Sequence, residues 1–482
     1  MIYVHVPFCR SFCTYCGFYS EICSRKETQQ VQNRLFEDYA EALCDEIDSR
    51  REEISAARDF VALDVTNLRF AHPTASLRLR SPRSRGHGRP RVCDTQCHKN
   101  DSFSPDTLYI GGGTPSVLPL AVLERIVRAL GPATYREFTV EVNPDDVVAG
   151  GAEYVAGLRA LGVNRVSMGV QSFDDGILRW MNRRHDAAGA REAFRLLRAG
   201  GFDNLSIDLI FGLSQLTGTI WESTIDEALA LGPEHISAYQ LSIEEDSELE
   251  KMVADGRYTE ASDEQCRSQY DALCRKLAEA GYVHYEISNW ARPGREAVNN
   301  SAYWRRVPYV GLGPGAHSLA FPGSADPHSP RGEQKPRFCS QEVPLQPRYE
   351  QNASFCSEVG DEQPKNEQKH AFCSSGGIRS WNSQELPRRE ADGRLVRWRS
   401  EHEVLSEREA AEETVMLGLR TAAGLPLSRL RDISPAHAVD ALLAEGALVL
   451  ITPVPDTPDA PFVRIPEGHF FVSDDIIARL LP

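Results

Sequence analysis

The sequence has no long run of apolar residues. No stretch approaches the roughly eighteen apolar residues that a membrane-spanning helix requires, so we expect no transmembrane helix. Positive charge is also scarce, because 53 Lys and Arg stand against 69 Asp and Glu and leave a net charge of -16. Nucleic acids are bound mainly through clustered Lys and Arg. We therefore expect small molecules or proteins as partners, and no nucleic acid.

We also expect no leader segment in this sequence. The first residues already have the pattern of a strand, with neither a secretory signal nor an Arg-rich transit peptide before them. This predicts a cytoplasmic protein, or an organellar one if a presequence is missing from the chain. The 12 cysteines agree with a reducing compartment, because the three most regularly placed have the spacing of metal ligands.

The length and composition are those of an ordinary globular protein. A chain of 482 residues, 41% hydrophobic and 25% charged, is long enough for one large domain and a smaller one.

Three cysteines, Cys9, Cys13 and Cys16, follow directly after a short apolar run that is closed by Pro7. A strand that turns into such a loop can direct three thiolates at one centre. A closed structural zinc site needs a fourth ligand, whereas an iron–sulfur cluster held by three cysteines keeps one iron open. The spacing favours the cluster; a zinc site and three unrelated buried cysteines are the alternatives.

Strand patterns alternate with helical patterns along the first part of the chain. Apolar residues at helical spacing predict a helix over 31–57, and a glycine loop over 111–115 directly follows the second strand pattern. Alternating strands and helices imply parallel strands with right-handed crossovers. We therefore predict an α/β fold with a partial (β/α)6 barrel and a site at the carboxyl ends of its strands. The six strands are expected up to residue 6 and over 107–110, 137–142, 165–170, 205–210 and 235–243.

Two aperiodic stretches divide the chain. Residues 59–105 are rich in Ser, Arg, Pro and Gly, and residues 324–377 contain three copies of a 17-residue unit with Glu-Gln and Phe-Cys-Ser. Both have the composition of disordered insertions. Cys93, Cys97 and His98 in the first are an alternative metal site, but they lack a convincing fourth ligand. We expect a first domain over 1–323.

The last segment, 378–482, is predicted to be a smaller C-terminal domain. Helical patterns over 406–421 and 436–443 precede short strand patterns over 448–451 and 462–465, an order like that of a winged helix. The expected wing has only Arg464 as a basic residue, so we interpret this domain as a lid or docking domain.

The amino-terminal motif also carries a family resemblance. Cys-x3-Cys-x2-Cys after Tyr-x-His-x-Pro-Phe, residues 3–16, resembles the opening of the radical S-adenosylmethionine (SAM) superfamily. More narrowly, it resembles oxygen-independent coproporphyrinogen III oxidase and the related HemW heme chaperones. The oxidase has a fourth cysteine two residues after the third, where this chain has Phe18, and HemW-type proteins lack that cysteine. The resemblance therefore favours the HemW branch, with 1–323 as the radical SAM domain and 378–482 as a HemN-type domain.

The resemblance implies two cofactors. A 4Fe-4S cluster would be held by Cys9, Cys13 and Cys16, and its electron would cleave SAM to a 5'-deoxyadenosyl radical. Glycines let the backbone approach a ligand, carboxylates accept hydrogen bonds from hydroxyl or ammonium groups, and arginine binds a carboxylate. The implied SAM contacts are Tyr3, Tyr15, Gly112, Gly113, Thr114, Glu141, Gln171, Arg183 and Asp208.

A second motif, residues 299–304, resembles the His-Asn-x-x-Tyr-Trp motif linked to heme binding in HemW. Asn299 stands at the histidine position, and asparagine is a poor ligand for heme iron. Either His284, His317 or a cysteine is then the ligand, or heme affinity is weakened or lost. Alternatively, the aromatic residues of this motif are only part of the core.

The resemblance thus predicts a heme chaperone that binds heme as cargo and transfers it to recipient proteins. The alternative is a coproporphyrinogen III oxidase, which performs a radical oxidative decarboxylation in porphyrin biosynthesis and which Phe18 disfavours. The expected partners are SAM, heme or another tetrapyrrole, a reductant protein and a heme recipient.

Overall fold

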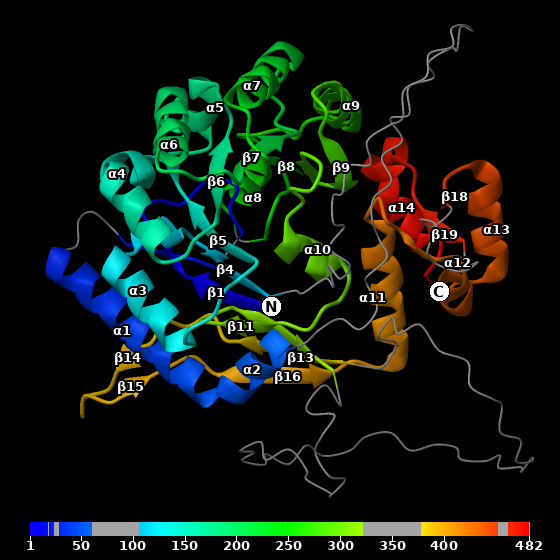
Figure 1. Ribbon diagram of the computed structural model, residues 1–482. Coiled ribbons are helices and arrows are strands. Elements are labelled where there is room, and N and C mark those ends of the chain that lie inside the picture. The colour runs from blue at the N-terminus through cyan, green and yellow to red at the C-terminus, as the bar shows by residue number, and fades with distance from the viewer. Residues whose placement is uncertain are drawn as a thin grey trace, which may run out of the picture.

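The computed structural model describes most of the chain outside the two predicted insertions (Figure 1). All but the terminal residues of the insertions 59–105 and 324–377 lie outside the described residues. Phe18 and the alternative metal site within the first insertion lie outside them too. The described residues are 1–17, 19–23, 28–59, 106–245, 247–321, 377–451 and 461–481.

Nine strands form the central sheet, in the order β11-β1-β4-β5-β6-β7-β8-β10-β9. The six strands from β1 to β8 in this order pair in parallel, β11 is parallel to β1, and β10 is antiparallel to β8. In the described part of the chain, the outer strands β11 and β9 do not pair with each other, so the barrel is partly open. The predicted strands and the fold class are confirmed. The bounds are Ile2–Val6 (β1), Thr107–Gly112 (β4), Glu137–Val142 (β5), Arg165–Gln171 (β6), Leu205–Phe211 (β7), His235–Gln240 (β8), Val283–Glu286 (β9), Asn289–Ala291 (β10) and Val310–Leu312 (β11).

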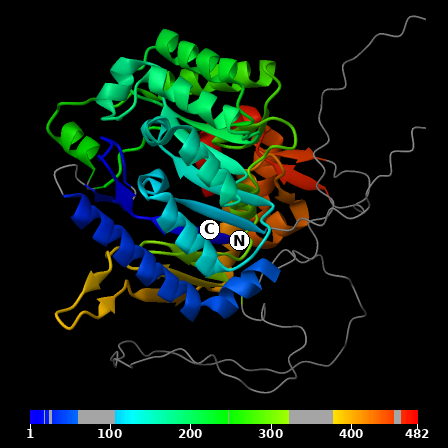
Figure 2. The ribbon, with the colours of Figure 1, turned by 60° about the vertical axis from the view of Figure 1, so that its left-hand side comes forward.

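Helices cover the outer face of this sheet (Figures 1 and 2). The long helices are α1 (Gln29–Ser49), α3 (Leu120–Leu130), α4 (Pro144–Ala160), α6 (Ala187–Ala199), α7 (Gly218–Leu231) and α9 (Asp263–Glu279). Shorter elements connect them: η1 (Pro115–Val117), α5 (Asp175–Trp180), α8 (Glu248–Ala254) and α10 (Val298–Trp304). None of the helices in the described residues is long and apolar enough to cross a membrane.

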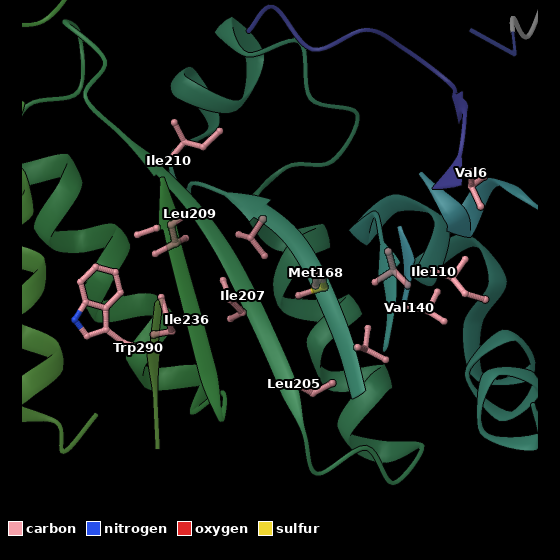
Figure 3. Packing of buried hydrophobic residues seen from close by; sticks show 14 of the residues in the cluster. Val6, Ile110, Val140, Met168, Leu205, Ile207, Leu209, Ile210, Ile236 and Trp290 are labelled. Carbon is pink, nitrogen blue, oxygen red and sulfur yellow. The ribbon is translucent and has the colours of Figure 1, made fainter. Parts of the chain in front are cut away.

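Apolar and polar side chains alternate along the parallel strands. Because successive side chains of a strand point to opposite faces, one set packs under the helices and the other set turns inward. Figure 3 shows part of the apolar layer, including Ile110, Val140, Met168, Ile207 and Ile236 from strands β4 to β8. The alternate positions form the inner face: Tyr109, Glu141, Ser167, Asp208 and Ser237. The barrel interior is therefore lined with polar groups.

The helix predicted over 31–57 is wrong in one respect, because two helices occupy this region. The first helix, α1, ends at Ser49, and the next residue, Arg50, has a φ of -115° and a ψ of 22°, outside the helical region. The guanidinium of Arg50 donates to the carbonyl oxygen of Gly311 at 2.7 Å and to Ser318 at 3.2 Å. The second helix, α2, spans Arg51–Asp59.

A second sheet joins segments on both sides of the predicted boundary at residue 378. Its strands are β12 (His317–Ala320), β13 (Ile378–Asn382) and β16 (Ser400–Val404), all antiparallel. The domain division remains a prediction, but its boundary passes through this sheet. Two small pairs complete this part of the chain: β2 (Phe8–Cys9) with β3 (Glu21–Ile22), and β14 (Arg388–Arg389) with β15 (Leu395–Val396).

The last segment has the order of a winged helix. From residue 407 onward, three strands pair as β17-β19-β18. Both predicted helices and both predicted strands are present, whereas β17, α12, η2 and α14 were not predicted. The elements are α11 (Glu407–Leu419), β17 (Leu425–Pro426), α12 (Leu427–Ile433), α13 (Ala436–Glu445), β18 (Val449–Ile451), β19 (Phe462–Arg464), η2 (Glu467–Val472) and α14 (Ser473–Ala478).

One buried carboxylate ties the second sheet to the barrel. Glu46 of α1 is 2% exposed and accepts four hydrogen bonds. One oxygen accepts from Asn382 at 2.8 Å and Arg50 at 3.2 Å. The other accepts from the backbone N–H of Gly313 at 2.8 Å and the indole of Trp398 at 3.0 Å. Removing the carboxylate would leave all four donors without this acceptor.

We expect Glu46→Ala to lower the free energy of unfolding by about 3 kcal/mol, because buried donors lose a charged acceptor. Denaturant unfolding followed by circular dichroism measures this change. The matched control is Glu124→Ala, which removes an exposed pair with Arg128 and should cost less than about 0.5 kcal/mol. Equal effects of the two variants would contradict the structural role of Glu46.

Candidate functional site

A cavity of about 480 Å³ opens at the carboxyl ends of the barrel strands. All three motif cysteines and eight of the nine residues predicted to contact SAM line it. These are Cys9, Cys13, Cys16, Tyr15, Gly112, Gly113, Thr114, Glu141, Gln171, Arg183 and Asp208. The tertiary structure thus brings together residues that are spread over 200 positions of the sequence, from Cys9 to Asp208.

Tyr3 is the exception, because it does not line this cavity. Its hydroxyl lies 3.0 Å from Nδ1 of His5, whose Nε2 lies 3.0 Å from the carbonyl oxygen of Tyr19. The Tyr3 ring is 6.1 Å from that of Tyr109, between centroids. Tyr3 therefore supports the strand that precedes the cysteine loop.

The cysteine loop is held by backbone contacts with two distant segments. Thr14 donates its N–H to the carbonyl oxygen of Met181 at 3.3 Å and its hydroxyl to that of Trp180 at 2.8 Å. Its own carbonyl oxygen accepts from the N–H of Leu249 at 2.9 Å. Phe8, just before the first cysteine, is fully buried. These contacts fix the loop over the open end of the barrel.

Two of the cysteine sulfurs lie within hydrogen-bonding distance of polar groups from distant loops. Cys9 Sγ is 3.3 Å from the hydroxyl of Thr114, and Arg183 donates through Nη1 to Cys13 Sγ at 3.2 Å. Burial raises the pKa of the Cys9 thiol. Burial alone would lower the pKa of Arg183, but Tyr15 and Cys13 raise it above its usual value. A positive charge therefore lies beside the sulfurs.

The glycine loop lets the backbone approach the cysteine loop closely. The φ of Gly112 is +105°, a conformation that favours glycine. A Cβ at Gly113 would lie 2.8 Å from the carbonyl oxygen of Phe8 and 2.9 Å from that of Val6. Side chains at these two positions would push the loops apart.

Two half-buried carboxylates occupy the inner wall of the cavity. Glu141 accepts from the hydroxyl of Tyr109 at 2.6 Å and from the N–H of Gly112 at 3.1 Å, and burial raises its pKa to about 7. Asp208 accepts from Ser167 at 3.2 Å, and burial raises its pKa to about 6. The cavity thus has acidic groups on this wall and Arg183 near the sulfurs, as a zwitterionic ligand would require.

Comparison with known proteins identifies the family. A model of the radical SAM superfamily matches residues 96–228, a stretch with the glycine loop and the ends of β5 to β7. The chain is 31% identical over 320 residues to the heme chaperone HemW of Bacillus subtilis, covering 65% of this chain and 69% of that protein. It is 32% identical over 323 residues to the HemW of Synechocystis, covering 66% of this chain and 65% of that protein. The chain belongs to the HemW family of radical SAM proteins.

A solved structure supports the fold of this HemW family member over its full length. Coproporphyrinogen III oxidase (HemN) from Escherichia coli matches with a TM-score of 0.60 at 18% identity, over 99% of this chain and 89% of that chain. A zebrafish relative named radical S-adenosyl methionine domain-containing protein 1, mitochondrial, is 34% identical over 48% of this chain and 51% of that protein. At 18% identity, the likeness to HemN shows the fold alone.

Membership of this superfamily implies an iron–sulfur cluster and SAM, and the cavity fits both. The half-buried sulfurs of Cys9 and Cys13 lie within hydrogen-bonding distance of Thr114 and Arg183, Arg183 adds a positive charge, and its Nε has no hydrogen-bond partner. The glycine loop leaves room that a Cβ would fill. Within the described residues, no three His, Cys, Asp or Glu side chains converge as ligands of a single metal ion.

Several lining residues of this HemW family member were not predicted. Ser167 lines the cavity and holds Asp208, and Tyr239, near the end of β8, is 44% exposed at the cavity. Tyr109 lies behind the lining and holds Glu141. The sequence contains a signal for Tyr109 and Ser167, since each lies two positions before a glycine at a strand end and hence on the same face. Without the barrel, that alternation does not reveal which face is the site.

Asn299 lies far from the cavity, at the opposite end of the barrel. It is 2% exposed, its side-chain oxygen accepts from Thr107 at 2.9 Å, and its N–H donates to Glu137 at 2.9 Å. Thr107 and Glu137 are the first residues of β4 and β5, whereas the cysteines lie near the strand ends. Asn299 is thus a core residue whose side chain and backbone N–H are both hydrogen-bonded.

The two alternative histidine ligands differ in access. His284 is buried, stacks on Trp290 at 4.1 Å between centroids, and has its pKa lowered by burial to about 3. His317 is exposed on β12, with its ring 6.3 Å from that of Trp381. His317 is the more accessible of the two.

The carboxyl of Glu141 should make stability depend on pH. Its pKa rises from 4.5 to about 7 on folding, so the folded state binds its proton more tightly than the unfolded chain. The free energy of unfolding therefore falls as pH rises from 4.5 to about 7, by about 3 kcal/mol at most from this group. In Glu141→Gln this component should vanish. Urea unfolding of both proteins across this range, without added SAM, measures the difference; parallel pH profiles would contradict it.

Proposed function

We propose that this protein is a HemW-like heme chaperone that binds a 4Fe-4S cluster and SAM in the cavity, and binds heme for transfer to recipient proteins. The observation that carries this proposal is the meeting of the three motif cysteines with the glycine loop and the half-buried carboxylates in one cavity. Family membership supports it further. The chain spans 65% of the length of the Synechocystis relative, and that protein's name states the chaperone role.

The residues of the cavity divide the binding between them. Cys9, Cys13 and Cys16 hold the cluster, which supplies a low-potential electron and an open iron when bound. Glu141 and Asp208 accept hydrogen bonds from hydroxyl or ammonium groups of SAM. The remaining proposed contacts with SAM are Tyr15, Gly112, Gly113, Thr114, Gln171 and Arg183. Tyr3 contributes to the site indirectly, through its contact with His5.

For heme, we favour His317 as the axial ligand over residue 299. An iron ligand needs an open side for the macrocycle, and Asn299 is enclosed by hydrogen bonds in the core. The His317 side chain is accessible, and its partial desolvation, with the nearby charge of Arg379, lowers its pKa, which favours the neutral imidazole that binds iron. An exposed ligand also suits a cargo that must leave.

The proposal includes a recipient protein, a reductant protein and a cytoplasmic location. The zebrafish and bovine relatives have the word mitochondrial in their names, which keeps an organellar location as the alternative.

The cluster is tested by anaerobic reconstitution. We expect the wild-type chain to gain iron, sulfide and a broad visible absorbance. Cys13→Ala should lose nearly all of this absorbance, because only two of the three cysteine ligands remain. The matched control is Cys44→Ala, which removes a half-buried thiol of α1 outside the cavity. A Cys13→Ala protein with the wild-type spectrum would sink the cluster assignment.

Heme binding is tested by titration followed at the Soret band. We expect His317→Ala to weaken binding at least about tenfold, or to change the ligand-dependent band position, because the proposed iron ligand is removed. The control is His402→Ala, an exposed histidine on β16 of the same sheet. Equal affinities and band positions in both variants would exclude His317 as the ligand.

The oxidase alternative has its own readout in the same preparation. The chain with its cluster is incubated with coproporphyrinogen III, SAM and dithionite. Release of decarboxylated product would favour the oxidase over the chaperone, whereas heme binding without product supports the chaperone.

A further inference from the structure

Arg183 is held against the cysteine loop by the turn that follows α5. Its N–H donates to the carbonyl oxygen of Leu178 at 2.9 Å, and the preceding Asn182 has a φ of +57°. The Asn182 side chain donates to the carbonyl oxygen of Phe12 at 2.6 Å. The same turn therefore contacts the cysteine loop twice, through Asn182 and through the guanidinium on Cys13.

The guanidinium has an unusual set of partners. It donates through Nη1 to Cys13 Sγ at 3.2 Å and through Nη2 to the carbonyl oxygen of Gly169 at 2.6 Å, while Nε has no partner. No carboxylate of the described residues forms an ion pair with it. Asp208, a half-buried acid of the same cavity, is hydrogen-bonded to Ser167. This half-buried positive charge of Arg183 has no carboxylate bonded to it, so it can stabilise negative charge that is added nearby.

The adjacent basic groups do not share this position. Arg184 also lines the cavity, but it pairs with Asp145 and Asp146, both at 2.8 Å, so these carboxylates neutralise its charge. His185 has its pKa lowered to about 3 by burial and by Arg183, and is neutral. Arg183 is thus the cation among these three that faces a cluster ligand.

We propose that Arg183 sets the reduction potential of the cluster, by donating an N–H···S hydrogen bond to Cys13 and placing its positive charge beside the sulfur. This inference rests on the proposed function, because it requires the cluster to be bound. Reduction adds one negative charge to the cluster, which a nearby cation and hydrogen bonds to sulfur stabilise. Arg183 therefore makes the cluster easier to reduce. Arg183 acts as a positioning residue, because it stabilises the reduced cluster through Cys13. This role is separate from any contact that its free Nε makes with SAM.

The test is a potentiometric titration of the reconstituted full-length chain without SAM, so that effects on SAM binding do not enter. Dithionite gives one electron to the oxidised cluster, and no bond or proton is exchanged. The variants are Arg183→Met, which removes both the charge and the hydrogen bond, and Arg183→Lys, which keeps the charge. The matched control is Arg179→Met, an exposed arginine at the end of α5.

We expect Arg183→Met to lower the ratio of reduced to oxidised cluster about tenfold at a fixed potential, a shift of about 59 mV to more negative values for one electron. Arg183→Lys should shift less, and Arg179→Met should match the wild type. Iron and sulfide content and circular dichroism show whether each variant has folded and is fully loaded. If Arg183→Met does not assemble the cluster, Arg183→Gln replaces it as the variant without charge.

The outcomes separate this inference from the proposed function. A fully loaded, uncharged variant with the wild-type potential overturns the role of Arg183 and leaves the cluster assignment intact. A wild-type chain that never assembles a cluster overturns the cluster assignment and this inference with it. A negative shift confined to the Arg183 variants supports the inference, because a merely structural role would not move the potential of an intact cluster.

Discussion

The alternation of apolar and polar residues along the parallel strands is the constraint on which the rest of this structure depends. Each strand must bury one face under the surrounding helices, and Val140, Met168 and Ile207 do so. The residues between them then face the barrel interior, because successive side chains of a strand point to opposite sides. That interior is polar, and its polar groups pair with one another, as Tyr109 does with Glu141. The same pattern that builds the core therefore builds the wall of the site.

Burial gives the polar wall its chemical character. In water, Glu141 and Asp208 would both be ionised near neutral pH, but the low dielectric of the interior raises both pKa values. Arg183 keeps its charge beside Cys13. The cavity thus contains both acidic and basic groups, and a ligand with charges of both signs fits it better than a neutral one. The glycine loop allows the close approach of such a ligand.

The two ends of the barrel carry different sequence motifs. The cysteine loop lies at the carboxyl ends, while the segment that resembles the heme motif caps the amino ends, where Asn299 joins Thr107 and Glu137. A strand of six residues, about 3.3 Å each, therefore lies between the two regions. Heme bound near residue 299 would be remote from the cluster, and the exposed sheet with His317 offers a different surface.

The sequence alone determined the class of the fold and most members of the site. Alternating strand and helix patterns predict six parallel strands, and strand ends predict where Gly112, Glu141 and Asp208 lie, because both signals are local in the chain. The cysteine spacing and the absence of a fourth cysteine at position 18 predict the family in the same local way. The break at Arg50 could not be read locally, since it depends on contacts of Arg50 with Gly311, 261 positions away.

Only the tertiary structure decided which residues hold the functional groups in place and which candidate ligands are enclosed in the core. Tyr109 and Ser167 look like ordinary strand residues until the neighbouring strands bring Glu141 and Asp208 to them. In the sequence, Asn299 has the position of a heme ligand that is no longer histidine. The structure shows instead that it is hydrogen-bonded within the core. In each case the deciding contact joins residues far apart in sequence, and no local pattern encodes the distance between them.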